Sequence, residues 1–423
     1  MLWPVAQLTF ARQVWVMLLG DALRLAIRLA KPPGDYWTEG YSFFYAIAHN
    51  LRAGGDTQIA HNLRASGGYA VFVGEPTAFR VPAYPLFIAA VQGLSDNPWR
   101  LIAAQWAVSV GTIGLAALLG RRLFNPPAGV AALLCAIYPY YAWHDLSLQE
   151  TGLFIFLTLL GTLLIYQLAE SGRLRTAAAA GLALALALAV LTRETLLPFA
   201  VLAVIWAGAM VWRGRGFRPA LLSAGAALAV FGLTLTPWLI KAHQIYGEYV
   251  LSSEFGRAVF VANHPLMFTN FPAASADRGR ELVYAELIGF RPTPWSWIII
   301  SWIKPLPGSS RISARSFRAR HASCGSRSVR GPPRATIFTA ILAMRSAGHR
   351  MLLLGLAGLW TSRRSWLMHL PIYAHLALFC ASTAMIWAQT SHRSYLDVYL
   401  MVFAGGCITY CWQLWRNEKT ALD

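Results

Sequence analysis

Long apolar runs separated by short polar turns make up most of the chain. A membrane-spanning helix needs about 20 mostly apolar residues, and ten runs approach that length. The first is Leu8–Ala30, which Asp21, Arg24 and Arg28 interrupt. The others are Leu101–Leu119, Ala128–Tyr141, Leu148–Leu168, Ala177–Leu191, Leu196–Val211, Ala220–Ile240, Ile337–Trp360, Trp366–Ala388 and Tyr395–Trp415. This pattern predicts an all-α integral membrane protein with about ten transmembrane helices.

The basic residues test this count, because they gather in alternate connections. These are Arg121/Arg122, Arg173/Arg175, Arg213/Arg215/Arg218, Arg363/Arg364 and Arg416/Lys419. Cytoplasmic loops carry the excess of Lys and Arg, so both termini are expected in the cytoplasm, at the inner (plasma) membrane. The first apolar run has no small-residue cleavage site after it and is interpreted as a retained span.

This topology divides the chain into a series of segments. They are a first transmembrane helix (1–30), a first external loop (31–99), a six-helix transmembrane core (100–240), a second external region (241–336), C-terminal transmembrane helices (337–415) and a cytoplasmic tail (416–423).

Composition agrees with a membrane protein and argues against a nucleic-acid partner. Only 13% of the 423 residues are charged and 57% are hydrophobic, with a mean hydropathy of +0.47, whereas soluble domains average about 25% charged residues. The net charge of +18 resides largely in short turns between apolar runs. The five cysteines show no CxxC spacing, and core packing is their expected role.

Two stretches are irregular. IAHNLRA occurs at Ile47–Ala53 and again at Ile59–Ala65, which indicates a local duplication. Residues 309–334 contain seven Arg, seven Ser and no acid. Two interpretations of this second stretch remain open: a polybasic external loop for anionic lipid head groups, or a frameshift within 305–350. The DNA sequence read in the other frames distinguishes them.

Polar residues on the predicted outer side are the candidates for chemistry. A carboxylate there would deprotonate an acceptor hydroxyl or hold a divalent cation, and Arg or Lys would neutralise the phosphate of a lipid-linked substrate. The acids are Asp35, Glu39, Asp56, Glu75, Asp145, Glu150 and Glu194, the cations are Arg80, Arg193 and Lys241, and the histidines are His144 and His243. Structural roles compete with these: the acids can cap helices, and Arg193 can extend to the membrane interface.

Four stretches carry a resemblance to a known family. They are IAHNLRASGGYAVFVGEPTAFRVPAYPLFIAA (Ile59–Ala90), LQETGLFIFLTLL (Leu148–Leu160), LTRETLLPF (Leu191–Phe199) and PWLIKAHQIYGEYVLSSEFGRAVFVANHP (Pro237–Pro265). In order and content they resemble the polytopic type C glycosyltransferases, specifically the bacterial dolichyl-phosphate-mannose–protein mannosyltransferase-like family. HRSYLDVYLMVFAG (His392–Gly405) is more weakly similar to the entry of the family's last helix.

The resemblance implies a GT-C-like fold with a helical first external loop that carries the catalytic acid. It implies transfer of a sugar from a polyprenyl-phosphate donor to a protein, lipid or polysaccharide acceptor of the cell envelope. Asp35, with Glu39, is the expected catalytic acid, and Asp56 is its rival at the repeat junction. The expected substrate-binding residues are Arg80, Tyr84, Asp145, Glu150, Arg193, Lys241 and Arg393.

The sequence also departs from the family pattern. The first external loop has no adjacent Asp-Glu or Asp-x-Asp pair, Lys241 replaces an arginine, and residues 309–334 match nothing in the family. An inactive or frameshifted member is therefore an alternative. A lipid-linked-sugar transporter or flippase is another, although such proteins show internal repeats and ionisable residues at mid-membrane depth. The sugar, the acceptor and any metal dependence are left open.

Overall fold

The computed structural model describes residues 3–29, 36–37, 41–52, 69–71, 77–93, 96–124, 129–170, 176–264, 334–385 and 390–422. The chain forms two compact units. The larger contains Met1–Glu254 and His349–Asp423, and the smaller contains Phe255–Gly348. All residues discussed below as functional candidates belong to the larger unit.

Helices account for most of the described residues, as expected for an all-α membrane protein. The elements of the first half are α1 (Trp3–Leu29), α2 (Ser42–Leu51), α4 (Ala83–Gln92), α5 (Pro98–Phe124), α6 (Gly129–Ile137), α7 (Pro139–Asp145) and α8 (Thr151–Glu170). Those of the second half are α9 (Thr176–Val190), η3 (Glu194–Leu196), α10 (Leu197–Arg215), α11 (Phe217–Tyr246), α12 (Glu254–Ala262), α16 (Arg334–Thr361), η5 (Arg363–Ser365), α17 (Trp366–Met385) and α18 (Thr390–Leu422).

Five helical stretches within the described part of the chain are long and apolar enough to cross a membrane. They are Pro98–Phe124, Thr151–Leu168, Glu194–Gly214, Phe217–Tyr246 and Tyr395–Trp415. Each coincides with a predicted span. The shorter α9 coincides with another, and many of its residues, including Leu182 and Leu186, are fully buried.

One predicted span is wrong. The run Ala128–Tyr141 is not one helix but two, α6 and α7, with Tyr138 extended between them (φ −71°, ψ 118°). Pro139 explains the break, because a proline pushes the preceding residue out of the helical region and itself suits the first turn of a new helix. The break matters because α7 delivers Asp145 to the interior of the bundle.

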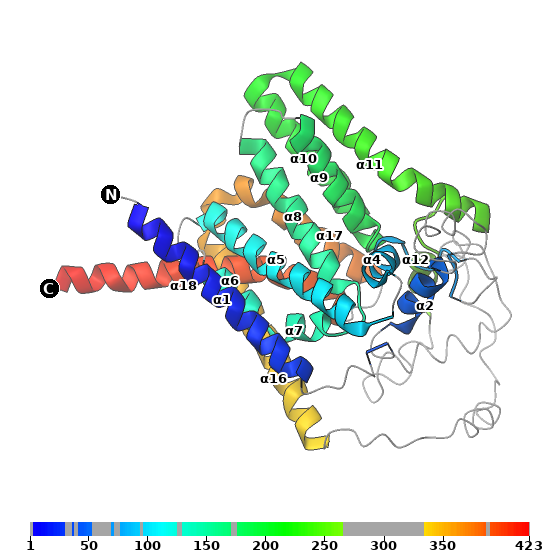
Figure 1. Ribbon diagram of the computed structural model, residues 1–423. Coiled ribbons are helices and arrows are strands. Elements are labelled where there is room, and N and C mark those ends of the chain that lie inside the picture. The colour runs from blue at the N-terminus through cyan, green and yellow to red at the C-terminus, as the bar shows by residue number, and fades with distance from the viewer. Residues whose placement is uncertain are drawn as a thin grey trace. The chain divides into compact units, whose positions relative to one another are not determined.

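Long helices of the larger unit pack side by side. α8 packs against α5 and α9, α9 against α11, and α11 against α10 (Figure 1). α1 packs on α5 and α6, while α18 packs on α5, α6 and α8. The ends of α8, α9, α10 and α11 therefore bring turns that are distant in sequence to the same end of the unit.

The first external loop contains two helices in its described part, α2 and α4, in agreement with the predicted helical loop. α2 and α4 pack together and α4 also packs on α5. The loop is anchored by a core cluster that joins Tyr36, Phe44 and Tyr84 to Leu101 and Leu148. Burial of this apolar surface, at about 25 cal/mol per Å², fixes the loop against the transmembrane helices.

Glycines permit close approach around α18. A β-carbon at Gly358 of α16 would lie 2.1 Å from the carbonyl oxygen of Phe403, and one at Gly406 would lie 2.7 Å from the Phe124 ring of α5. Small residues at helix interfaces let backbones approach closely in membranes. α18 is thus held tightly on two sides.

Candidate active site

Backbone hydrogen bonds connect turns that follow different helices. The amide of Ala83 donates to the carbonyl of Leu191 at 2.8 Å, and the amide of Ser253 donates to the carbonyl of Ala78 at 3.0 Å. The amide of Ala78 donates to the Tyr246 hydroxyl at 3.3 Å. These bonds hold the first loop against the turn after α9 and the segment after α11, so charged residues on all three are fixed near one another.

Five charged side chains gather there, and we call them the charged cluster: Arg80, Glu150, Arg193, Glu194 and Glu254. Arg193 Nη2 lies 2.6 Å from Glu150 Oε1, and Arg80 Nη2 lies 3.9 Å from Glu254 Oε1. Ser252 donates to Glu194 at 2.8 Å. The structure therefore brings together three of the predicted substrate-binding residues, Arg80, Glu150 and Arg193.

Local geometry explains how the two arginines reach the cluster. Arg193 is extended (φ −154°, ψ 112°) between the end of α9 and η3, so its side chain leaves the helical register. The carbonyl of Arg80 accepts a hydrogen bond of 2.9 Å from the hydroxyl of the fully buried Tyr69. Pro82, the residue before α4, restricts the backbone just after Arg80.

Arg80 retains hydrogen-bonding capacity. Its guanidinium carbon lies 4.9 Å from the Phe79 ring centre and 5.5 Å from that of Phe43. Its Nε is buried and has no hydrogen-bond partner within the described part of the chain, and the 3.9 Å separation from Glu254 exceeds hydrogen-bond range. Arg80 is thus oriented by aromatic rings while leaving donors for an anion.

The carboxylates around Arg80 set its protonation. Burial lowers the pKa of Arg80, but the negative charges of Glu254, Glu194 and Glu150 together raise it above its ordinary value. Arg80 therefore carries a full positive charge at every physiological pH, as a phosphate-binding group requires.

Glu150 lies in the turn before α8 and is the acid of the tighter ion pair. Burial raises its pKa, but the adjacent Arg193, with Arg80, outweighs burial and holds the pKa of Glu150 below its ordinary value. The Arg193 guanidinium also stands 5.2 Å from the Phe154 ring centre. Glu150 is consequently ionised at neutral pH and acts as a counter-ion rather than as a proton donor.

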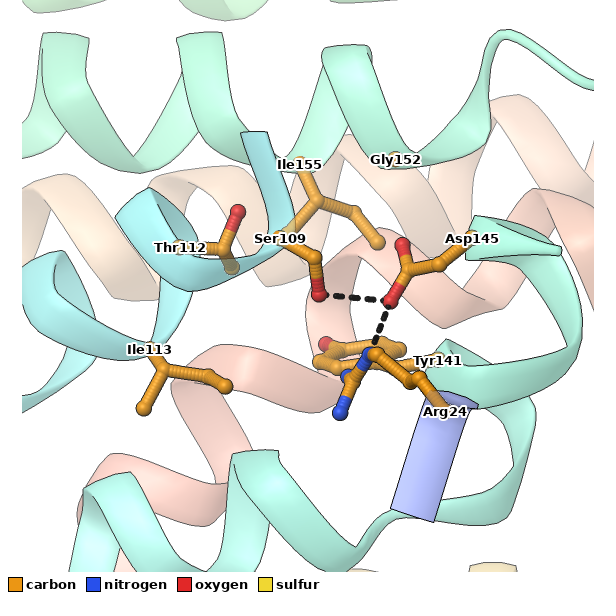
Figure 2. A pocket seen from close by; sticks show the side chains of 8 residues that line it. All are labelled: Arg24, Ser109, Thr112, Ile113, Tyr141, Asp145, Gly152 and Ile155. Carbon is orange, nitrogen blue, oxygen red and sulfur yellow. Dashed lines mark hydrogen bonds and ion pairs between the residues drawn. The ribbon is translucent and has the colours of Figure 1, made fainter. Parts of the chain in front are cut away.

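Asp145 lies apart from these contacts, in a buried pair with Arg24 of α1. Arg24 Nε donates to Asp145 Oδ2 at 2.8 Å and Ser109 donates to the same oxygen at 2.6 Å (Figure 2). The three residues, with Tyr141 and Gly152, line a cavity of only about 10 Å³, roughly the space for one water molecule. Within the fold Asp145 is the counter-ion of Arg24, and its predicted role in substrate binding stays a prediction.

Two further predicted residues are buried in packing positions. The Tyr84 ring lies edge-on to Phe44 in the loop core, and its hydroxyl is 3.5 Å from Gln105 Oε1. Lys241 is buried in α11, three residues after Trp238, whose ring packs against Tyr69 at 4.8 Å. Neither position is exposed at the charged cluster.

The three predicted catalytic acids lie outside the described residues: Asp35, Glu39 and Asp56. The side chain of Arg393 does too, although its backbone belongs to α18. Tyr36, the residue after Asp35, is fully buried and donates its hydroxyl to Gln105. In the described part of the chain, no group of three His, Cys, Asp or Glu side chains is arranged to hold a metal ion.

Sequence reasoning placed Glu194 beside Arg193 on the predicted outer side but gave it no role. It missed Glu254 and the partner of Asp145. Glu254 lies 174 positions after Arg80, and Arg24 lies 121 positions before Asp145. No local pattern links either pair, so only the fold reveals them.

Comparison with known proteins gives structural likeness without sequence likeness. No protein-family model matches the chain, and no curated protein matches its sequence. The fold is similar to an apo oligosaccharyltransferase of Archaeoglobus fulgidus, with a TM-score of 0.56 at 16% identity over 100% of this chain and 53% of that one. Archaeal oligosaccharyltransferase AglB from A. fulgidus, in complex with an inhibitory peptide and a dolichol-phosphate, gives 0.49 at 14% identity, over 99% and 52%.

The chain thus spans about half the length of the solved proteins it resembles. At 14–16% sequence identity, the likeness supports a shared fold and nothing beyond it. That fold is polytopic and all-α, and it agrees with the resemblance seen in the sequence. The chain therefore has an all-α fold similar to that of the A. fulgidus oligosaccharyltransferase.

Proposed function

We propose that the protein is a membrane glycosyltransferase that moves a sugar from a polyprenyl-phosphate donor to an acceptor at the outer face of the cytoplasmic membrane. The observation that carries the proposal is the charged cluster, in which Arg80 and Arg193 both lie close enough to Glu150 to act on its charge, on a fold similar to that of an oligosaccharyltransferase. The acceptor class remains protein, lipid or polysaccharide, and the first external loop supplies the catalytic acid.

The roles follow from the chemistry of the transfer. The acceptor oxygen forms a bond to the anomeric carbon while the bond from that carbon to the phosphate oxygen breaks. The acceptor proton passes to a carboxylate, for which Asp35 is proposed, with Glu39 and Asp56 as alternatives. The leaving polyprenyl phosphate gains negative charge, and a guanidinium placed beside it stabilises that charge in the transition state.

Arg80 is the more suitable phosphate ligand of the two arginines. Arg193 already makes a 2.6 Å contact with Glu150, whereas the Arg80 pair with Glu254 is 3.9 Å long. A phosphate that approaches Arg80 would therefore displace only a weak, partly solvated interaction. Arg193 would support the site by neutralising Glu150.

Sugar transfer in membranes containing variants tests these roles. With a radiolabelled polyprenyl-phosphate sugar as donor, Asp35→Asn should abolish transfer. Arg80→Lys, which keeps the charge but loses the planar fork, should lower kcat/KM about 10- to 100-fold, since a hydrogen bond to a charged group contributes about 1.5–3 kcal/mol.

Arg52→Ala is the matched control. Arg52 belongs to the same loop, but its ion pair is with the exposed Asp96, at 2.5 Å, outside the charged cluster. It should transfer sugar at the wild-type rate. Full activity of both Asp35→Asn and Arg80→Lys would remove the assignment, and donor translocation across vesicles without transfer would favour a flippase.

A further inference from the structure

A polar pocket lies at the C-terminal end of α5, away from the loop core at its N-terminal end. Leu101, near the start of α5, packs in the loop core beside Leu148, whereas Arg122, near its end, lines this pocket. The 21 helical steps from Leu101 to Arg122 span about 32 Å at 1.5 Å per residue, close to the thickness of the bilayer core, about 30 Å. The pocket is therefore at the opposite membrane surface from the charged cluster, and we call it the helix-end pocket.

The helix-end pocket has the composition of an anion site. Its cavity volume is about 490 Å³, and it is lined by the ends of α5 and α16, the start of α17 and the middle of α18. The lining supplies the Arg122 guanidinium and the hydroxyls of Ser362, Ser365, Thr409 and Tyr410. No acidic side chain is among the described residues that line it, so a negative group meets donors and no like charge.

A buried histidine in the wall of the helix-end pocket has polar atoms without partners. His369 is 1% exposed, and neither ring nitrogen has a hydrogen-bond partner within the described part of the chain. Its ring stacks on Phe124 with centres 5.8 Å apart. A buried polar group without a partner is destabilising, and an oxygen-rich ligand in the pocket would provide the missing acceptor.

Tryptophans place the helix-end pocket at the level of the lipid head groups. Trp360 and Trp366 lie at the ends of α16 and α17 beside it, Trp412 and Trp415 lie in the second half of α18, and each is at least half exposed. Exposed Trp is enriched where a membrane protein meets the head-group region. Arg363 and Arg364, between the pocket residues Ser362 and Ser365, are also exposed.

We propose that the helix-end pocket binds the phosphate head group of an anionic membrane phospholipid. Arg122 would contact the phosphate, the hydroxyls and His369 would complete its hydrogen bonds, and Leu123, Phe124 and Met368 would meet the first acyl carbons. These apolar residues beside the donors favour a lipid over a soluble phosphate. The site goes beyond the proposed sugar transfer and does not depend on it.

Quenching of tryptophan fluorescence by brominated lipid tests the proposal. The purified full chain in a neutral detergent is titrated with phosphatidylglycerol or phosphatidylcholine that carries bromine on the acyl chains. Phosphatidylglycerol should bind in preference. Arg122→Gln and Ser365→Asp should each weaken it about five-fold, the equivalent of ~1 kcal/mol for one charge near the membrane surface.

Two matched variants separate the site from general surface attraction. Arg121→Gln removes the neighbouring charge, which does not line the pocket, and Ser365→Asn changes size without charge; both should bind like the wild type. The Ser365 pair also controls for folding, because the residue is exposed. Equal loss in Arg121→Gln and Arg122→Gln, or equal quenching by phosphatidylcholine, would overturn the site. Competition by millimolar inorganic phosphate would overturn its assignment to a lipid.

Discussion

Replacing Arg24 by methionine should destabilise the protein although the side chain touches no solvent and no predicted substrate. The exposed fractions of the Arg24 and Asp145 side chains are 0% and 6%. Arg24→Met leaves the Asp145 carboxylate buried with the Ser109 hydroxyl as its remaining described partner. The reciprocal change, Asp145→Asn, leaves a buried guanidinium beside a neutral amide.

The magnitude follows from the contacts. Breaking a buried pair by removing one partner costs about 3–5 kcal/mol, because the other charge stays in a low-dielectric site. The double variant Arg24→Met/Asp145→Asn buries no charge. It loses mainly the two 3.0 Å bonds from Arg24 to the carbonyls of Gly20 and Ala136, at about 1 kcal/mol each. The double variant should therefore be more stable than either single variant.

Unfolding of the wild type, the two single variants and the double variant in detergent micelles measures this double-mutant cycle. Cys135 and Cys407 are buried, so a thiol-reactive fluorophore reports their exposure as the bundle opens. The exposed Cys380 and Cys411 react at once and set the baseline. Additive losses, with the double variant the least stable of the three, would refute the reasoning, because they would show no energetic coupling between the two charges.

The same variants separate two roles for Asp145. If it serves only as the counter-ion of Arg24, the double variant should recover sugar transfer together with stability. If the carboxylate also binds substrate, the double variant should recover stability and remain inactive. Stability and activity must therefore be measured on the same preparation.

Two other perturbations test the packing and the charged cluster. Gly358→Ala should cost about 1–3 kcal/mol, because its β-carbon would lie 2.1 Å from the Phe403 carbonyl; Gly232→Ala on α11, with open space around it, should lose nothing in the same unfolding assay. The pKa of Glu150 is lower in the folded protein than its ordinary value, so its ion pair with Arg193 contributes to the free energy of unfolding at neutral pH. That contribution is lost as pH falls below about 4.3 through the folded pKa, so melting temperatures of wild type and Glu150→Gln should converge in acid. A difference in melting temperature between the two proteins that stays constant from pH 7 to pH 3 would contradict this.

Hydropathy predicted the helices well because each long apolar run must satisfy its own backbone in a membrane. The break at Tyr138 was missed because run length was given more weight than Pro139, although the proline was visible in the sequence. The motif around Arg80 and the short turn around Arg193 correctly indicated side chains that the structure brings together. Their acidic partners were harder to find, since contacts such as Arg80 with Glu254 arise only when α11 returns the chain to the first loop.

The first helix was predicted although Asp21, Arg24 and Arg28 interrupt its apolar run, and α1 runs unbroken from Trp3 to Leu29. Both arginines are buried, and Arg24 is matched by a carboxylate from another helix. The sequence of one helix shows that burying such a charge is unfavourable, but it does not show which residue elsewhere in the chain pairs with it.

The pairing of Arg24 with Asp145 also has a consequence for the order of biosynthesis. The two residues are 121 positions apart, so at roughly 5–20 residues per second Asp145 is synthesised about 6–24 s after Arg24. During that interval α1 carries a guanidinium whose counter-ion has not been made. A stable place for α1 among its neighbours therefore depends on the arrival of α7, and a chain stalled before that point should remain open to proteases at its first helix.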